Sequence, residues 1–115
     1  MPADPRTFDQ NVPNAARIYD WLIGGKDHYA ADRAAGRRLV TAVPGMRQAA
    51  RDNRAFLARV TRYLAAEAGI TQFIDIGSGL PTPGNTHEVV GAVTPLAGWS
   101  TWTTTPWSGP MRANR

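Results

Sequence analysis

Hydrophobic positions recur at a helical spacing through the N-terminal part of this chain and then give way to a short apolar run. The first helix is predicted from Pro13, because apolar residues recur at intervals of three and four up to Ile23. Gly24-Gly25 should end this helix, since glycine readily adopts the backbone conformation that follows a helix C-terminus. Residues 1–11 are polar and contain prolines, which predicts a disordered N-terminus.

Two further helices are predicted before the apolar run. Asp27 can cap a helix that continues to about Val43, where Pro44-Gly45 stops it. The next helix has the clearest period of the chain and should end at Gly69. Its expected buried side consists of Met46, Ala49, Ala50, Asn53, Phe56, Leu57, Val60 and Leu64.

The apolar run itself predicts a strand that ends in an acid and enters a glycine turn. Phe73, Ile74 and Ile76 are bulky or β-branched, as expected of a strand covered on both faces. Gly77 and Gly79 allow backbone angles that are closed to other residues, and they let a ligand approach the main chain.

A fourth helix is predicted directly after this turn. Asn85 can cap it, and Glu88, three residues on, can reach back to the cap. A strand, a glycine turn and a helix N-terminus together form a nucleotide-type cofactor site at the carboxyl end of the strand. Asp75 is the strand-end acid of this site, although the same residue type is also common in simple turns.

Two longer strings, FIDIGSGLPTPGNTHEV and PNAARIYDWLIGGKDHYAADR, resemble the S-adenosylmethionine-dependent methyltransferase-like family common in actinobacteria. The resemblance runs from about Val12 to about Pro95. It implies an α/β fold, with N-terminal helices plus the first strand–loop–helix unit of a Rossmann-like methyltransferase sheet. In that family a helical N-terminal segment folds over the cofactor pocket, and the cofactor is S-adenosyl-L-methionine.

The resemblance also implies which residues bind the cofactor. By position, the glycine turn would wrap its methionine part, and the block around Gly24-Gly25 would form a lid. The implied cofactor-binding residues are Asp75, Gly77, Ser78, Gly79, Tyr19, Gly25, Lys26 and Tyr29. One departure is Pro81, which stands where the broader superfamily often has a third glycine.

Two histidines are the remaining candidates for chemistry. His28 is either a base or a polar surface residue, and the second interpretation is favoured. His87 lies in the first turn of the fourth helix, where the helix N-terminus disfavours a charged imidazole, so a neutral role is the default. No catalytic residue is therefore assigned, and no spacing of ligand residues suggests a metal site.

Composition narrows the class of protein further. The 115 residues include no cysteine and carry a formal charge of +4, mostly from arginine. No apolar run reaches the roughly 20 residues of a membrane helix, and the N-terminus lacks a signal-peptide pattern, so a cytoplasmic location is expected. The basic residues alternate with acidic ones, which predicts a solvated helix face and does not favour nucleic-acid binding. The acidic residues in question are Asp32, Asp52 and Glu67.

The C-terminal stretch AGWSTWTTTPWSGPMRANR holds three of the four tryptophans and has neither a helical nor a strand period. Because tryptophan has the single codon TGG, a shift of one base forces an aspartate across Trp102-Thr103. The shifted segment can then read VVYVDNDPVVRAHAR, a second strand that ends in an acid. We therefore expect that a base loss near Ala97-Gly98 shifted the frame and truncated the protein. The rival account is a tryptophan-rich binding tail.

These inferences divide the chain into a disordered N-terminus (1–11), a helical cofactor-lid segment (12–69), a strand, glycine loop and helix (70–97), and a non-native, disordered tail (98–115). Nothing after Pro95 is expected to pair with the single strand in this frame. The length is about half that of a doubly wound domain, so an incomplete, inactive methyltransferase-like fragment is predicted. A small basic helical module that binds nucleic acid or protein is the alternative, and the methyl acceptor and oligomeric state stay open.

Overall fold

The computed structural model describes residues 9–77, 79–80 and 84–102, which form four helices and a two-stranded parallel sheet. The helices are α1 (Ala15–Leu22), α2 (Ala30–Ala42), α3 (Met46–Ala66) and α4 (Thr86–Val93). The strands are β1 (Gln72–Ile76) and β2 (Gly98–Trp102). The predicted α/β class is correct. The expected disorder of residues 1–11 falls mostly outside the described residues.

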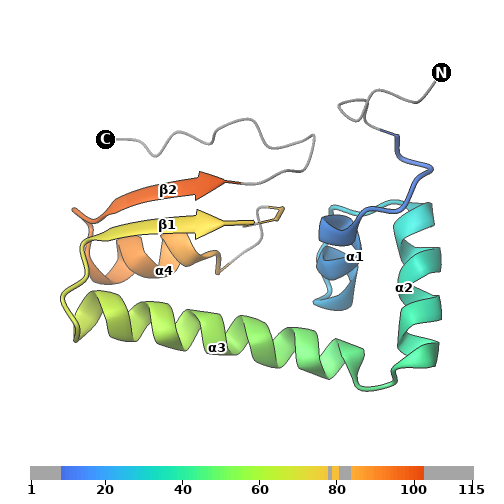
Figure 1. The fold of residues 1–115 in the computed structure, drawn as a ribbon, viewed down its shortest axis with the longest axis horizontal. Helices are drawn as coiled ribbons and strands as arrows, with labels where there is room; N and C mark the ends of the chain where they lie inside the picture. Colours follow the sequence, from blue (N-terminus) through green and yellow to red (C-terminus); the bar gives the residue numbers. More distant parts are fainter. Residues whose placement is uncertain (1–8, 78, 81–83, 103–115) are drawn as a thin grey trace.

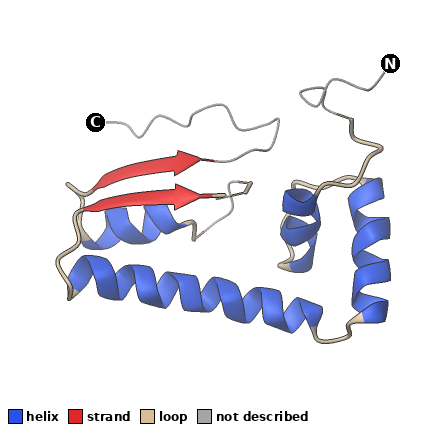
Figure 2. Cartoon of the chain, viewed as in Figure 1, coloured by secondary structure: helices blue, strands red, loops and turns tan. Residues whose placement is uncertain are grey.

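The long helix α3 joins the two ends of this fold, with α1 and α2 near its N-terminus and α4 and the strands near its C-terminus (Figure 1). It contacts α1, α2 and α4. The helix α4 lies between the strands and α3, which gives this end of the molecule three layers (Figure 2). None of the described helices combines the length and apolar character needed to cross a membrane.

Two glycines end helices as predicted. Gly24 follows α1 with a φ of 83°, and Gly69 follows α3 with a φ of 71°. Because this left-handed conformation is unfavourable for side chains, glycine is the residue that can redirect the chain there. The prediction that Asp27 caps α2 is wrong. The helix begins at Ala30, and the carboxylate of Asp32 accepts the N–H of Tyr29, at 2.9 Å, from inside the first turn.

The buried side of α3 agrees with the predicted one only in part. Its buried residues are Ala50, Thr61 and Ala65, whereas Phe56 is 58% exposed. Small side chains let helices approach closely, so alanine and threonine are the fully buried residues of this side. Larger members of the predicted set are half-buried beside them: Met46, Leu57, Val60 and Leu64. The apolar period correctly predicted the helix and most of its covered side, whereas Ala49, Asn53 and Phe56 of the predicted set are exposed.

The strand β1 is covered on one face, not on both as expected. Phe73 and Asp75 are half-buried on the covered side, while Ile74 and Ile76 point the other way and are exposed. The expectation that nothing after Pro95 pairs with this strand is also wrong. The strand β2 pairs with β1 in parallel, from Gln72 opposite Gly98 to Ile76 opposite Trp102. Residues 98–102 of the expected disordered tail are thus a strand, and residues 103–115 lie outside the described part.

Candidate functional site

The carboxyl end of β1 has the geometry that its sequence predicts. The Asp75 carboxylate accepts a hydrogen bond from the Thr86 hydroxyl, with 3.2 Å between the two oxygens, so the strand end is tied to the start of α4. Gly77 and Gly79 have φ angles of 73° and 72°. Ser78, between them, lies outside the described residues. An added Cβ on Gly77 would meet no described atom within 4 Å, so the main chain is open to an approaching ligand there.

The start of α4 is organised differently from its prediction. Asn85 is the N-cap residue, but its side chain makes no capping hydrogen bond to the helix and instead accepts one from Arg54 of α3. Glu88 does reach back, and its carboxylate accepts the N–H of Gly84 at 2.7 Å. The glycine loop is therefore held at its far end by contacts to both α3 and α4.

The helix α1 lies against the glycine loop. A Cβ built on Gly79 would come within 4.0 Å of the Ala16 Cβ. Both strands point their carboxyl ends towards this helix (Figure 1). The N-terminal block and the glycine turn, which are far apart in the sequence, therefore meet at one place in the fold. Whether α1 acts as a lid over a cofactor stays a prediction.

The predicted lid residues have varied surroundings. The Tyr19 hydroxyl donates to the Ala50 carbonyl of α3 at 3.1 Å, so this tyrosine fastens α1 to α3. Lys26 is exposed, and its ammonium lies 3.1 Å from the Asp27 carboxylate. Tyr29 is half-buried at the start of α2. Of these side chains, Lys26 is thus the most accessible from solvent.

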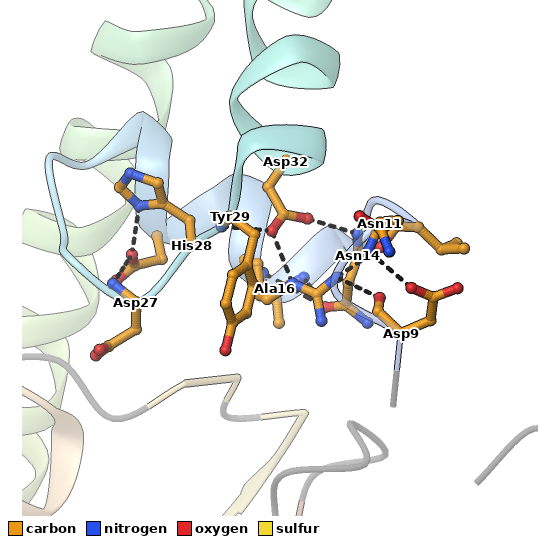
Figure 3. A network of polar contacts seen from close by, with 11 residues as sticks. Asp9, Asn11, Asn14, Ala16, Asp27, His28, Tyr29 and Asp32 are labelled. Atoms are coloured by element: carbon orange, nitrogen blue, oxygen red, sulfur yellow. Dashed lines mark hydrogen bonds and ion pairs between the residues drawn. The ribbon is translucent and has the colours of Figure 1, made fainter. Parts of the chain in front are cut away.

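Gly25 has a structural task that does not require a cofactor. A Cβ at this position would lie 1.9 Å from Oδ1 of Asp20, which excludes any side chain without rearrangement. The carboxylate of Asp20 is buried and its Oδ2 accepts the N–H of Asp27 at 2.8 Å. The same oxygen lies 3.0 Å from Nδ1 of His28 (Figure 3). This contact orients the imidazole, because a carboxylate beside Nδ1 favours the proton on that nitrogen.

A second buried carboxylate organises the N-terminal segment. The Asp32 side chain, fully shielded from solvent, forms an ion pair with Nε of Arg17 at 2.8 Å. It also accepts the backbone N–H groups of Asn14 and Tyr29, each at 2.9 Å (Figure 3). Nη2 of Arg17 in turn donates to the Val12 carbonyl at 2.6 Å. The pair therefore fastens the start of α1 and the start of α2 to one another.

The pKa of Asp32 is lower than its usual value of 3.8 as the result of opposing effects. Burial alone raises the pKa, because it disfavours the charged form. The hydrogen bonds from Arg17, Asn14 and Tyr29, together with the charge of Arg17, lower it by more. The carboxylate is thus ionised at neutral pH.

The sequence did not reveal these buried charges. Asp32 was expected on a solvated helix face, and that interpretation is wrong, because its carboxylate is buried against Arg17. Arg17 was not assigned any role, and Asp20 was expected only as part of the block around Gly24-Gly25 that the resemblance suggests as a lid. The one available signal was Asn14, whose side chain caps α1 by accepting the N–H of Ala16 at 2.9 Å. Such a cap locates the helix start but does not identify the ion pair behind it.

His87 and the tryptophan of the second strand lie on the covered side of the sheet. The His87 side chain is exposed, and its ring centroid is 6.4 Å from that of Trp99. Trp99 also lies beside Phe73, with the ring centroids 5.8 Å apart. The described ring contact of His87 is thus with the sheet, and its role stays a prediction.

Comparisons with known proteins agree with this arrangement. A family model described as S-adenosyl methyltransferase matches residues 1–98. A crystal structure from Thermobifida fusca YX, of a protein provisionally assigned as a methyltransferase, is 46% identical with a TM-score of 0.78. A DUF574 family protein from Streptomyces avermitilis MA-4680 is 43% identical with a TM-score of 0.79.

The alignments cover most of this chain but little of the two solved proteins. They span 88% and 81% of this chain, but only 37% of the Thermobifida protein and 36% of the Streptomyces protein. The structure therefore corresponds to part of a larger domain. Comparison with the curated proteins found no match.

Proposed function

Since the chain belongs to the S-adenosyl methyltransferase family, we propose that it carries the first part of a methyltransferase's binding site for S-adenosyl-L-methionine. The observation that carries this proposal is the unit of β1, the glycine loop and the start of α4. In that unit Asp75 ends the strand, and Gly77 and Gly79 both have positive φ angles. Parallel sheets bind nucleotide-like ligands beyond the carboxyl ends of their strands.

The described residues fit such a ligand. The open side of Gly77 admits the cofactor close to the backbone, where N–H groups can donate to its methionine carboxylate. The Asp75 carboxylate, oriented by Thr86, fixes the loop or receives the cofactor's ammonium group. Gly79 completes the turn against α1.

The N-terminal helices supply the opposite wall of the proposed site. Lys26 is exposed and is available to a carboxylate of the bound cofactor. Tyr19, Gly25 and Tyr29 act mainly by holding the segment in place. In this proposal the lid is positioned by its buried contacts and not by the cofactor itself.

The cofactor would supply an electrophilic methyl group on a sulfonium centre. The task of this chain is positioning, because methyl displacement requires the attacking atom, the carbon and the sulfur in line. The carboxylates beside the loop are already engaged, Asp75 with the Thr86 hydroxyl and Glu88 with the Gly84 N–H, so deprotonation of an acceptor is not assigned to any residue. We therefore propose that the chain alone binds the cofactor without transferring its methyl group.

Calorimetric titration with S-adenosyl-L-methionine tests the site. Gly77→Ala should weaken binding, while Gly69→Ala should leave it unchanged. The two glycines are matched, since their φ angles are 73° and 71° and an added Cβ meets no described atom within 4 Å at either position. Both substitutions carry a similar strain of about 1 kcal/mol, so only proximity to the cofactor separates them.

Equal effects of the two variants, or no heat of binding at about millimolar cofactor, would contradict the proposed site. A methyl-transfer assay with radiolabelled cofactor and mixed small-molecule and protein acceptors addresses activity separately. Transfer by this chain would show that the proposed inactivity is wrong, because it would require an acceptor site within the part of the domain represented here.

We also propose that a single-base loss near Ala97-Gly98 changed the reading frame. Two observations support it: the forced aspartate codon across Trp102-Thr103, and a family match that ends at residue 98. Formation of β2 by residues 98–102 is compatible with this, because parallel pairing uses backbone groups and tolerates changed side chains. Sequencing the locus is the test. An undisturbed codon series with no downstream frame encoding further strands would end the proposal.

No specific observation favours the alternative of a basic nucleic-acid-binding module. Several arginines are engaged within the fold: Arg17 pairs with Asp32, Arg54 donates to Asn85, and the Arg47 guanidinium lies 3.8 Å from the centre of the Trp21 ring.

We further propose an actinobacterial origin and a cytoplasmic location. The first is supported by the family resemblance and the second by the lack of cysteine.

A further inference from the structure

The long helix α3 forms one edge of the molecule. The other helices and both strands lie to one side of it (Figure 1). Its fully buried residues, Ala50, Thr61 and Ala65, are on the side that these elements cover. Within the part of the chain that the structure describes, the opposite side of α3 faces solvent.

Six exposed residues run along this opposite side at alternating intervals of three and four. We call them the outer stripe of α3: Ala49, Asp52, Phe56, Arg59, Tyr63 and Ala66. The spacing is the heptad repeat of helices that pack along one another. Phe56 is 58% exposed and Tyr63 is 54% exposed, with Arg59 between them. Aromatic residues and arginine are the types enriched in protein interfaces, so the stripe has the composition of a contact surface.

The outer stripe is complementary to itself when two copies of the helix run antiparallel. A two-fold axis places the stripe of one copy against the reversed stripe of the other. In one register Phe56 of each copy lies opposite Arg59 of the other, where the guanidinium can stack on the ring. In the same register Asp52 of each copy lies opposite Tyr63 of the other, where the carboxylate can accept the phenol O–H. Each charged side chain of the stripe thus has a suitable partner.

Other arrangements of two α3 helices are less favourable. A parallel pair would set Arg59 against Arg59 and Asp52 against Asp52, and such like-charge contacts are repulsive. An antiparallel pair shifted by one heptad sets Asp52 against Phe56 in one direction and leaves it beyond the end of the partner helix in the other. In the favoured register Ala49 faces Ala66 of the second copy, so small side chains let the helices approach closely at both ends.

We propose that the outer stripe of α3 is a homodimer interface, through which two copies of the chain pair by antiparallel α3 helices. One carboxylate oxygen of Asp52 accepts a hydrogen bond from Gln48 of its own helix, at 2.8 Å, and the other oxygen is left for Tyr63 of the second copy. Pairing does not have to form α3, because the helix is part of the fold of each copy. The inference does not depend on the proposed cofactor site.

Sedimentation equilibrium of the 115-residue chain measures this association. An interface made by one helix of each copy is small, so we expect a dissociation constant between about 1 and 100 µM. The chain should be a monomer well below this range and a dimer above it. A chain that stays monomeric at about 300 µM would overturn the proposal.

A substitution in the centre of the stripe identifies the surface. Phe56→Lys sets a lysine against Arg59 of the other copy in two symmetry-related layers, so it should weaken the dimer by at least about a hundredfold. Leu96→Lys is the matched control and should change the dissociation constant less than about twofold, since Leu96 is 97% exposed and lies outside α3. Both side chains are exposed, so far-UV circular dichroism should show the parent fold for both variants. Equal weakening by the two variants would show non-specific adhesion and would overturn the proposal.

A mixture of two weakened variants tests the assigned layers. Arg59→Glu removes the cation beside Phe56 and should weaken the dimer about tenfold on its own. In a mixture with Phe56→Lys, the introduced lysine faces the introduced glutamate, and the other central layer keeps Arg59 against Phe56. We expect the mixture to form a heterodimer at concentrations where each variant alone is monomeric. Failure of the mixture to associate would contradict these layers.

Cysteine cross-linking tests the antiparallel direction, because the chain has no cysteine of its own. Ala49→Cys and Ala66→Cys, mixed and mildly oxidised, should form a disulfide between copies. Each variant alone should cross-link at least about tenfold more slowly, since in the proposed pair two copies of the same position lie about 25 Å apart along the helices. Cross-linking of one variant alone as fast as the mixture would show a parallel or non-specific contact and would overturn the proposal.

Discussion

Replacing Asp32 with alanine should be among the most damaging substitutions in the N-terminal helices. The carboxylate is shielded from solvent and accepts one hydrogen bond from the Arg17 guanidinium and two from backbone N–H groups. Its removal leaves an arginine that is 5% exposed without its counter-charge and two amides without their acceptor. Loss of one partner of a buried ion pair costs about 3–5 kcal/mol. That is a large share of the roughly 5–15 kcal/mol that stabilises a typical domain.

Urea unfolding followed by far-UV circular dichroism at neutral pH measures this cost by linear extrapolation. Lys26→Met is the matched control, because its ion pair with Asp27 has similar length but is exposed, with 89% of the lysine side chain accessible. The control should change the unfolding free energy by less than about 0.5 kcal/mol, since solvent screens such pairs. Combining Asp32→Ala with Arg17→Met should cost less than the sum of the two single changes, since neither charge is then left buried alone.

A loss below about 1 kcal/mol for Asp32→Ala would refute this reasoning, because it would mean that water already reaches the pair. Strict additivity in the double variant would refute it in another way. It would show that Arg17 and Asp32 stabilise the helices independently, despite the 2.8 Å between Nε and Oδ2.

Three further predictions concern the stability of the fold. Because the folded-state pKa of Asp32 lies below 3.8, its stabilising contribution is complete above that value and is lost as the pH falls below it. The parent should therefore lose more stability than Asp32→Asn between about pH 5 and pH 2 in urea titrations. Gly36→Ala should lower the unfolding free energy by about 1–3 kcal/mol, because its Cβ would lie 2.3 Å from the Trp21 ring. Gly91→Ala is the control: its Cβ would meet no described atom within 4 Å, so it should raise the unfolding free energy by about 0.5–1 kcal/mol. Tyr19→Phe should lower the unfolding free energy by about 1 kcal/mol in the same assay, because it removes the hydroxyl that donates to the Ala50 carbonyl of α3. An unchanged unfolding free energy would show that water replaces this contact.

Local sequence signals predicted the elements whose causes are local. The glycines after α1 and α3 were recognised because a positive φ is a property of one residue. The strand and glycine loop were recognised because β-branched residues, an acid and two glycines follow one another directly. The acid and the two glycines at the carboxyl end of β1 could thus be expected before the structure was known, whereas the hydrogen bond from Thr86 to Asp75 was not predicted.

Features that depend on distant partners were missed. The pairing of Arg17 with Asp32 spans fifteen residues and joins two helices, so no helical spacing marks it. The apolar period of α3 predicted most of its covered side, but the exposure of Phe56 depends on which neighbours lie beside it, and the period does not contain that information. The strand β2 was missed because its side chains lack a strand pattern, while its backbone groups still complete the ladder with β1.

The long helix α3 explains why the two halves of the candidate site stay in register. On one side it receives the hydroxyl of Tyr19 and sends Arg47 to the carbonyl groups at the end of α1. On the other side it sends Arg54 to Asn85, beside the glycine loop. A movement of α1 away from the loop would break the first set of contacts, and a movement of the loop would break the second. α1 is therefore anchored to the same helix as the loop that it faces, and in the proposed site a ligand between them would meet walls that are already assembled.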